Sequence, residues 1–172
     1  MKKCFFTACL LLATLLIKAQ SLPCSNPVYR QFDFWLGEWE AFNVSGNKAG
    51  DSKISVMLDS CIILEEWTST AVTNGLHYAG KSYNTYNAAK QKWQQYWVDN
   101  TGGVTEYFNG RFVNGVMILE TDNIKQADST NKIMKMTFTK LAADKVRQHG
   151  ESSTDNGKTW KTDFDLEYRR KK

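Results

Sequence analysis

Polar and apolar residues alternate along most of the chain after residue 36. In the run 132–139, every second residue from Met134 to Phe138 is apolar, and the residues between them are polar. The runs 92–97 and 163–168 alternate in the same way. Alternation of period two is typical of half-buried β-strands, and no stretch after residue 36 carries the apolar stripe of an amphipathic helix. The pattern predicts an all-β fold.

Turn-forming residues recur about every 8 to 14 residues between the alternating runs, a spacing typical of all-β sandwiches and barrels. Several turns are Asn-Gly pairs, which supply the positive φ angles that a tight hairpin needs, at positions 74–75, 109–110 and 114–115. The number of runs predicts about 8–10 antiparallel strands joined mostly by hairpins. Such a meander favours an up-and-down barrel over an immunoglobulin-like sandwich. We therefore expect a single barrel domain over residues 20–172.

Residues 1–19 have the layout of a secretory signal peptide. Two lysines precede an almost wholly apolar run, 5–17, and Ala19 stands at the expected cleavage site. The apolar run is shorter than the about 20 residues that a membrane-spanning helix needs. The rival interpretation is a lipoprotein signal cut before Cys24, but Pro23 stands where that signal has a small residue. We expect an exported protein, periplasmic or extracellular, without a membrane span.

Export changes the charge balance of the protein. The full chain has 22 basic and 18 acidic residues, and loss of residues 1–19 would remove three lysines and no acidic residue. The exported part is then close to neutral, and four of its basic residues form the run 169–172. A nucleic-acid-binding protein presents a basic face, so this composition argues against nucleic acid as a partner.

Two of the four cysteines, Cys24 and Cys61, lie in the expected exported part. An even number of cysteines in an exported protein favours a disulfide. The alternative is a free, buried Cys61 beside Ile62 and Ile63. We favour the disulfide, which would close a loop of about 38 residues and stabilise the fold by about 3–4 kcal/mol in the chain-entropy model. Two cysteines without a nearby histidine fall short of a zinc site, so no metal is predicted.

An aromatic cluster, FDFWLGEWE, occupies residues 32–40. Its Gly37 and Trp39 match the G-x-W signature of lipocalins and their calycin relatives, which the cluster resembles. The resemblance implies that residues 27–35 form a short helical plug, and that Gly37 lets the chain turn tightly into the first strand. It also implies that Trp39 packs inside the base of the barrel. In that family a basic side chain covers the tryptophan, and the candidates here are Arg147, Arg169 and Arg170.

The resemblance extends along the whole expected domain. The matching segments follow one another in order and are 32–40, 61–67, 82–86, 92–99 and 146–148. Together they are similar to a bacterial family of secreted, calycin-like β-barrel domains with an FWxGEW opening motif and no assigned function. The resemblance implies a lipocalin- or nitrobindin-like barrel in an exported bacterial protein. It transfers no catalytic residue.

Residues 153–160, STDNGKTW, fit the Asp-box pattern S-x-D-x-G-x-T-W. In such a turn Asp155 binds the backbone amides, Gly157 takes a conformation that other residues disfavour, and Trp160 packs beneath. Asp-boxes occur in sialidases and other secreted β proteins, away from the catalytic centre. We interpret this one as a structural hairpin and not as evidence for a glycosidase.

Two predicted strands carry aromatic and polar residues on the same face. One face holds Trp93, Gln95 and Trp97, and another holds Glu65 and Trp67. If these faces point inward, the lumen has apolar walls with a few orienting polar groups, which is typical of a ligand pocket. The alternative is that the tryptophans fill the core, with Gln95 and Glu65 bonded to neighbours. The lumen candidates are Glu65, Trp67, Tyr83, Trp93, Gln95, Trp97 and Arg147.

Glu65 and Glu66 are adjacent and face opposite sides of one strand, so they do not form a paired-carboxylate site. One of them is expected inside the barrel, where a carboxylate without a partner is costly, and we predict Arg147 as that partner. Such a pair either binds a polar head group or ties two strands together. The second role is the commoner one, because structural ion pairs also perturb buried charges.

The likeness to nitrobindin raises the question of haem, which in that family needs an axial histidine from a late strand. His149 lies on a late predicted strand, but it alternates with Gln148, so only one of the two faces the lumen. A single histidine without a supporting motif is a weak basis for haem. We predict no cofactor.

Three functions fit these patterns. The first is binding of a small, largely apolar ligand in the lumen. The second is an enzyme with Glu65 or Glu66, Arg147 and Tyr83 as acid-base candidates, and the third is a surface interaction module with a filled lumen. A cavity lined by tryptophans favours the first, and an inward carboxylate with a raised pKa in an open pocket favours the second. We rank them in this order and keep all three, because fold alone does not fix function.

Overall fold

Eleven strands and two short 3₁₀ helices follow one another along residues 23–172, the part of the chain that the computed structural model describes. The predicted signal peptide, residues 1–19, lies outside this part. The helices are η1 (Pro27–Arg30) and η2 (Asp33–Trp35). The strands are β1 (Gly37–Asn43), β2 (Lys48–Met57), β3 (Ile62–Thr73), β4 (Leu76–Asn87), β5 (Lys92–Asp99), β6 (Val104–Val113), β7 (Val116–Glu120), β8 (Ile124–Lys125), β9 (Asn131–Ala142), β10 (Lys145–Ser153) and β11 (Lys161–Arg170).

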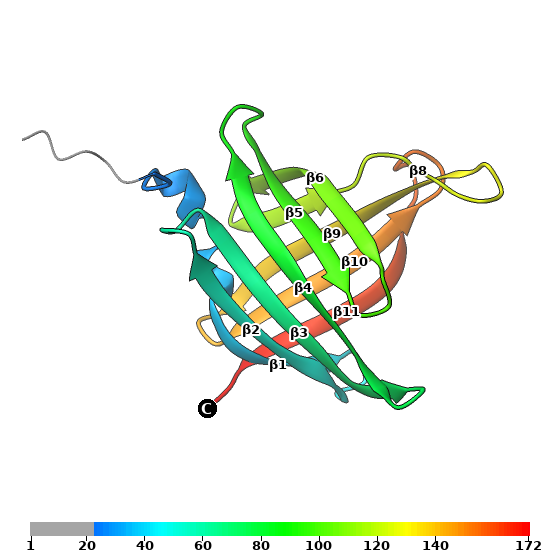
Figure 1. The fold of residues 1–172 in the computed structure, drawn as a ribbon, viewed down its shortest axis with the longest axis horizontal. Helices are drawn as coiled ribbons and strands as arrows, with labels where there is room; N and C mark the ends of the chain where they lie inside the picture. The colour runs from blue at the N-terminus through cyan, green and yellow to red at the C-terminus, as the bar shows by residue number, and fades with distance from the viewer. Residues whose placement is uncertain (1–22) are drawn as a thin grey trace, which may run out of the picture.

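The strands form one antiparallel sheet that closes on itself. Their order is β10-β11-β1-β2-β3-β4-β5-β6-β7-β9-β8, and a further pairing between β9 and β10 completes the ring. The short strand β8 pairs with β9 and lies outside this ring, so the barrel has ten strands (Figure 1). Most neighbours are consecutive in sequence, as the hairpin signals predicted. The all-β prediction and the barrel prediction are confirmed, and the architecture is consistent with a calycin-like fold.

The strands send alternate side chains into the barrel, which is the consequence of strand pleating. In β9, Met136 and Phe138 are buried, and in β1 Trp39 and Ala41 are buried. β1 starts beside the helices and each later barrel strand reverses direction. The turns after β1, β3, β5, β7 and β10 therefore all lie at the end of the barrel away from the helices.

The two 3₁₀ helices form a plug at one end of the barrel, drawn in blue at the left of Figure 1, opposite β8. Phe32 and Trp35 are fully buried there. Their rings stack with centroids 5.0 Å apart, and the Trp35 ring lies 4.6 Å from the ring of Phe138. This end of the lumen is therefore filled by packed aromatic side chains.

Gly37 and Trp39 join the plug to the first strand. Gly37 has a φ of 130°, a region that favours glycine, and a Cβ there would collide with the guanidinium of Arg170. Trp39 is buried, and its Nε1 donates to the carbonyl of Trp35 at 2.8 Å. Of the three arginines considered from the sequence, Arg170 covers the indole, with Cζ 4.4 Å from the ring centroid.

A disulfide between Cys24 and Cys61 ties the segment before η1 to the turn between β2 and β3. The predicted bridge is confirmed, and Cys61 is not free. Arg30 supports the same junction, because its Nη2 donates to the carbonyl of Ser60. A disulfide is typical of proteins that are exported to an oxidising compartment. Within residues 23–172, no helix is long and apolar enough to cross a membrane.

The Asp-box segment forms the turn between β10 and β11. Asp155 accepts hydrogen bonds from the Thr159 amide at 2.9 Å and from the Ser153 hydroxyl at 2.7 Å. Gly157 has a φ of 80°, and its carbonyl accepts from Nε1 of Trp160 at 3.1 Å. These contacts are internal to the turn, so the segment acts here as a structural hairpin.

Candidate functional site

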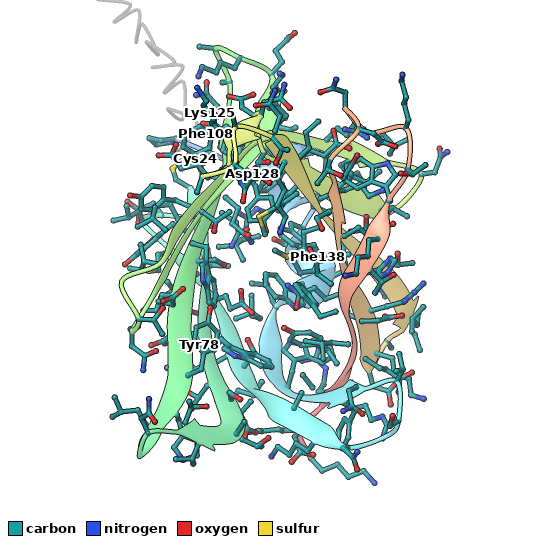
Figure 2. The ribbon with its side chains drawn as sticks, turned by 90° about the vertical axis from the view of Figure 1, so that its right-hand side faces the viewer. Cys24, Tyr78, Phe108, Lys125, Asp128 and Phe138 are labelled. Atoms are coloured by element: carbon teal, nitrogen blue, oxygen red, sulfur yellow. A yellow bond between two sulfur atoms is a disulfide. The ribbon has the colours of Figure 1, made fainter. Side chains whose placement is uncertain are left out.

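The half of the barrel away from the plug contains a cavity of about 380 Å³. Its wall is mostly aromatic and includes Trp67, Tyr78, Trp97, Tyr107, Phe164 and Tyr168. Figure 2, viewed from the side on which β8 lies, shows Phe138 of the packed core inside the ring of strands and Tyr78 on its wall. Pockets for small ligands typically measure about 300–1,000 Å³, so the cavity has room for a small molecule.

Glycines in neighbouring strands hold two of these rings flat against the wall. A Cβ at Gly50 of β2 would lie 2.6 Å from a ring carbon of Trp67, and a Cβ at Gly80 of β4 would collide with the ring of Trp97. Each indole therefore occupies the space where its neighbour lacks a side chain. Because the rings fill the space beside the wall and not the centre of the lumen, the cavity stays open.

Glu65 of β3 lies on the floor of the cavity, with only 3% of its surface exposed. Its Oε1 accepts a hydrogen bond from Ser52 of β2 at 3.1 Å, and its Oε2 accepts one from Ser82 of β4 at 3.0 Å. The hydroxyl of Tyr168 lies 3.4 Å from Oε1, but it donates to the closer Oε1 of Gln148 at 2.5 Å. Among the salt bridges of residues 23–172, none involves Glu65, so neutral groups alone hold this carboxyl.

Burial raises the pKa of Glu65 to about 7, against the hydrogen bonds from Ser82 and Ser52, which lower it. The cause is desolvation, which penalises the charged form of a carboxyl group. Near neutral pH, Glu65 is therefore divided between a carboxylate, which accepts hydrogen bonds, and a carboxylic acid, which also donates one.

Gln95 of β5 completes the floor and leaves one acceptor unused. Asn84 of β4 donates from Nδ2 to the carbonyl of Ile63 at 3.0 Å and to Ser82 at 2.9 Å, so its Oδ1 faces Gln95. Gln95 donates from Nε2 to that oxygen at 2.8 Å. Its own Oε1 then has no hydrogen-bond partner within the described part of the chain, although Gln95 is only 1% exposed. A buried acceptor without a donor is costly.

Asp99, at the end of β5, organises the mouth of the cavity. Its Oδ1 accepts hydrogen bonds from the amides of Thr101 at 2.9 Å and Gly103 at 3.1 Å, and its Oδ2 accepts from the Tyr78 hydroxyl at 3.1 Å. These hydrogen bonds, led by that from the Thr101 side chain, lower the pKa of Asp99 to about 2. The mouth therefore carries a permanent negative charge, and Tyr78 is fixed beside it.

Four of the seven predicted lumen residues line the cavity, namely Glu65, Trp67, Gln95 and Trp97. Trp93 shares their inward direction but lies deeper, in the packed core. Its ring meets that of Phe32 at 6.0 Å, and its Nε1 donates to Gln31 at 3.0 Å. Trp93 therefore holds the plug in place and does not line the cavity.

Tyr83 and Arg147 do not reach the lumen, so their predicted positions are wrong. Tyr83 is 39% exposed on the outer face, because its neighbours Ser82 and Asn84 point inward. Arg147 alternates with the buried Val146 and Gln148 and therefore points outward. There it pairs with Asp165, with Nη2 2.7 Å from Oδ2, and not with Glu65.

The acid-base candidates of the enzyme hypothesis are also separated. Glu66 lies on the outer face and pairs with Lys81, whose Nζ is 2.8 Å from Oε2. With Tyr83 and Arg147 outside as well, Glu65 is the one candidate of this set that lines the cavity. The lumen therefore contains the titratable carboxyl of Glu65, but not the other predicted acid-base residues, Glu66, Tyr83 and Arg147.

His149 also lies on the outer face, where its Nε2 is 3.0 Å from the hydroxyl of Thr162. Its neighbour Gln148 is the residue of the two that faces the lumen. Within residues 23–172, no three side chains of His, Cys, Asp or Glu gather as metal ligands would.

Several residues that line the site or support Glu65 were not predicted from the sequence. Tyr168 and Leu166 share the inward face of the alternating run 163–168, a signal that could have marked them. Tyr107 lies in a less regular strand. No local pattern identifies Ser52 and Ser82 as the partners of Glu65, because they come from different strands.

Comparison with models of known protein families gives no match for this sequence, and comparison with curated proteins gives none either. The functional assignment therefore rests on the cavity and on the side chains that line it.

Proposed function

We propose that this protein is an exported, calycin-like barrel that binds a small, largely apolar ligand in its lumen. The cavity of about 380 Å³ between the packed core and the open end carries this proposal. Its mostly aromatic wall and its few polar floor groups are the make-up of sites that bind small ligands. The disulfide supports export to the periplasm or beyond, and segment 32–40 supports membership of the secreted bacterial family that it resembles.

A surface interaction module with a filled lumen fits the geometry less well. The aromatic residues of the plug fill one end of the barrel, yet Gly50 and Gly80 hold Trp67 and Trp97 against the wall at the other. A barrel whose interior served only stability would gain from side chains in that space, because voids weaken packing. The open half of the lumen therefore favours a ligand.

Glu65 gives a specific reason to consider catalysis as a second function. A carboxyl with a pKa of about 7 in an open pocket suits general acid-base catalysis near neutral pH. Catalysis also needs groups that bind and polarise a substrate, and Glu66, Tyr83 and Arg147 lie on the outer surface. The site supports binding better than catalysis.

Titration with N-phenyl-1-naphthylamine, a neutral apolar dye that fluoresces in apolar surroundings, tests the proposed function. We expect saturable binding of one dye per barrel. Thr105 lines the cavity, so Thr105→Trp should fill it and abolish binding. Glu106 is exposed on the outer face, so Glu106→Trp is the matched control and should bind like the unmodified protein. Equal binding by both variants, or no saturable binding to the unmodified protein, would overturn the lumen proposal.

A further inference from the structure

The ionisable side chains that line the cavity are all acidic or phenolic. They are Glu65, Asp99, Tyr78, Tyr107 and Tyr168, and none of the lysines, arginines and histidines of residues 23–172 lines it. Burial raises the pKa of each of the three tyrosines, so they stay neutral. The cavity therefore holds a fixed negative charge at its mouth, a second one at its floor when Glu65 is ionised, and no positive charge.

The floor also offers an acceptor that lacks a donor. Oε1 of Gln95 is buried and has no hydrogen-bond partner among the described residues. The Asn84 side chain fixes this orientation, because Gln95 must donate to Asn84 Oδ1 from Nε2. The charge of the cavity and the unused acceptor are independent observations: the negative charge calls for a ligand with positive charge, and the acceptor calls for a ligand with a hydrogen-bond donor.

We propose that the lumen binds an organic ammonium, a protonated primary amine on an apolar body, with its head group against Glu65 and Gln95. This inference rests on the proposed lumen function. The N–H groups of the ammonium would donate to the Glu65 carboxylate and to Gln95 Oε1, and charge-assisted hydrogen bonds of this kind are the strong ones. Trp67 and Tyr168, with ring centroids 6.2 Å apart, add aromatic faces that attract a cation.

The same geometry disfavours an anionic ligand. A carboxylate in the lumen would meet Asp99 at the mouth and Glu65 at the floor, with no lysine, arginine or histidine of the described chain lining the cavity to pair with it. A neutral alcohol with the same apolar body would fill the same space and donate one hydrogen bond. The charge on the head group therefore separates the three classes of ligand.

Glu65 also makes the binding depend on pH. The side chains that contact its carboxyl are Ser52 of β2, Ser82 of β4 and Tyr168 of β11, and none of them is charged near neutrality. Asp99 across the cavity stays ionised and the other tyrosines stay neutral between pH 5 and 8. Glu65 is therefore the lining group that changes charge in this range, so affinity for an ammonium should fall as pH falls.

Competition with N-phenyl-1-naphthylamine tests the inference with three ligands that share one apolar body. They are 2-(2-naphthyl)ethylammonium, 2-(2-naphthyl)ethanol and 3-(2-naphthyl)propanoate. At pH 8 we expect the ammonium to displace the dye at a concentration at least about tenfold below that of the alcohol, since a charged partner roughly doubles the strength of a hydrogen bond. The propanoate should be the weakest. From pH 8 to pH 5 the ammonium should lose this advantage, while the alcohol should bind equally well throughout.

Glu65→Gln keeps the shape of the floor and removes its charge, so it should abolish both the preference and its pH dependence. Glu66→Gln, on the outer face of the same strand, is the matched control and should preserve both. Equal displacement by alcohol and ammonium at pH 8, tightest binding of the propanoate, or an unchanged preference in Glu65→Gln would each overturn the inference and leave the lumen proposal standing. Absence of dye binding would instead overturn the lumen proposal. If Glu65→Gln does not fold, the inference is still tested by the comparison of the three ligands with the unmodified protein and by the pH dependence of ammonium binding.

Discussion

Replacement of Glu65 by glutamine should change how the stability of the barrel depends on pH. Glu65 is buried, and its carboxyl has a pKa of about 7 in the folded protein, against 4.5 as the ordinary value. The folded state therefore holds this proton more tightly than the unfolded state does. The stabilisation that the proton provides is fully present below pH 4.5, and it is lost as pH rises through the folded pKa of about 7.

The size of this effect follows from the pKa shift. A shift of one pKa unit corresponds to about 1.4 kcal/mol, so the rise at Glu65 amounts to about 3 kcal/mol in the free energy of unfolding. Glutamine in its place cannot ionise. From pH 5 to pH 8.5, the unmodified protein should therefore lose about 2–3 kcal/mol of stability relative to Glu65→Gln. Any constant difference from altered hydrogen bonds to Ser52 and Ser82 leaves this slope unchanged.

Urea unfolding followed by tryptophan fluorescence at several pH values measures this difference. Other groups with shifted pKa values, such as Asp51, Asp99 and Asp165, are common to both proteins, so their effects cancel in the comparison. Glu66→Gln serves as the control and should run parallel to the unmodified protein over the same range. Parallel curves for Glu65→Gln and the unmodified protein would show that the carboxyl is not desolvated, and the account of the cavity floor would fail.

Trp39→Ala should lower the free energy of unfolding by about 3–5 kcal/mol, since it empties the base of the core; a loss within experimental error in urea unfolding would contradict the role given to the opening motif. Thiol titration of the denatured, unreduced protein isolated after export should find no free thiol, and two thiols would contradict the bridge between Cys24 and Cys61. Gly80→Ala should push the indole of Trp97 from the wall, lower the stability by about 1–3 kcal/mol and weaken dye binding. Unchanged dye affinity in that variant would refute the account of how the cavity is kept open.

The strands, the Asp-box turn and the disulfide were predictable because each leaves a direct signal in the sequence. Alternation in the run 132–139 reports directly which side chains point inward, since strand pleating sets the period. The Asp-box turn at 153–160 is a local set of hydrogen bonds. Two cysteines in an expected exported chain leave one intramolecular pairing, between Cys24 and Cys61.

The site was less predictable because it depends on the pairing register of the strands and on how deep each side chain lies along the barrel. Alternation along one strand reports neither. The polar Ser82 points inward, where it donates to Glu65 on the neighbouring strand, and the aromatic Tyr83 points outward, so sorting the faces by hydrophobicity selects the wrong one. Arg147 lies beside Asp165 through the pairing of β10 with β11, a fact that no local pattern contains. Trp93 points inward as expected, but its depth places it against the plug.

A native mass spectrum of the protein, purified from an exporting host without added ligand, would show whether the lumen carries a ligand. We expect extra mass that leaves on denaturation, with the composition of a small, largely apolar molecule that carries an amine. A bare mass for this preparation, together with a bare mass after addition of N-phenyl-1-naphthylamine, would contradict a ligand-binding lumen.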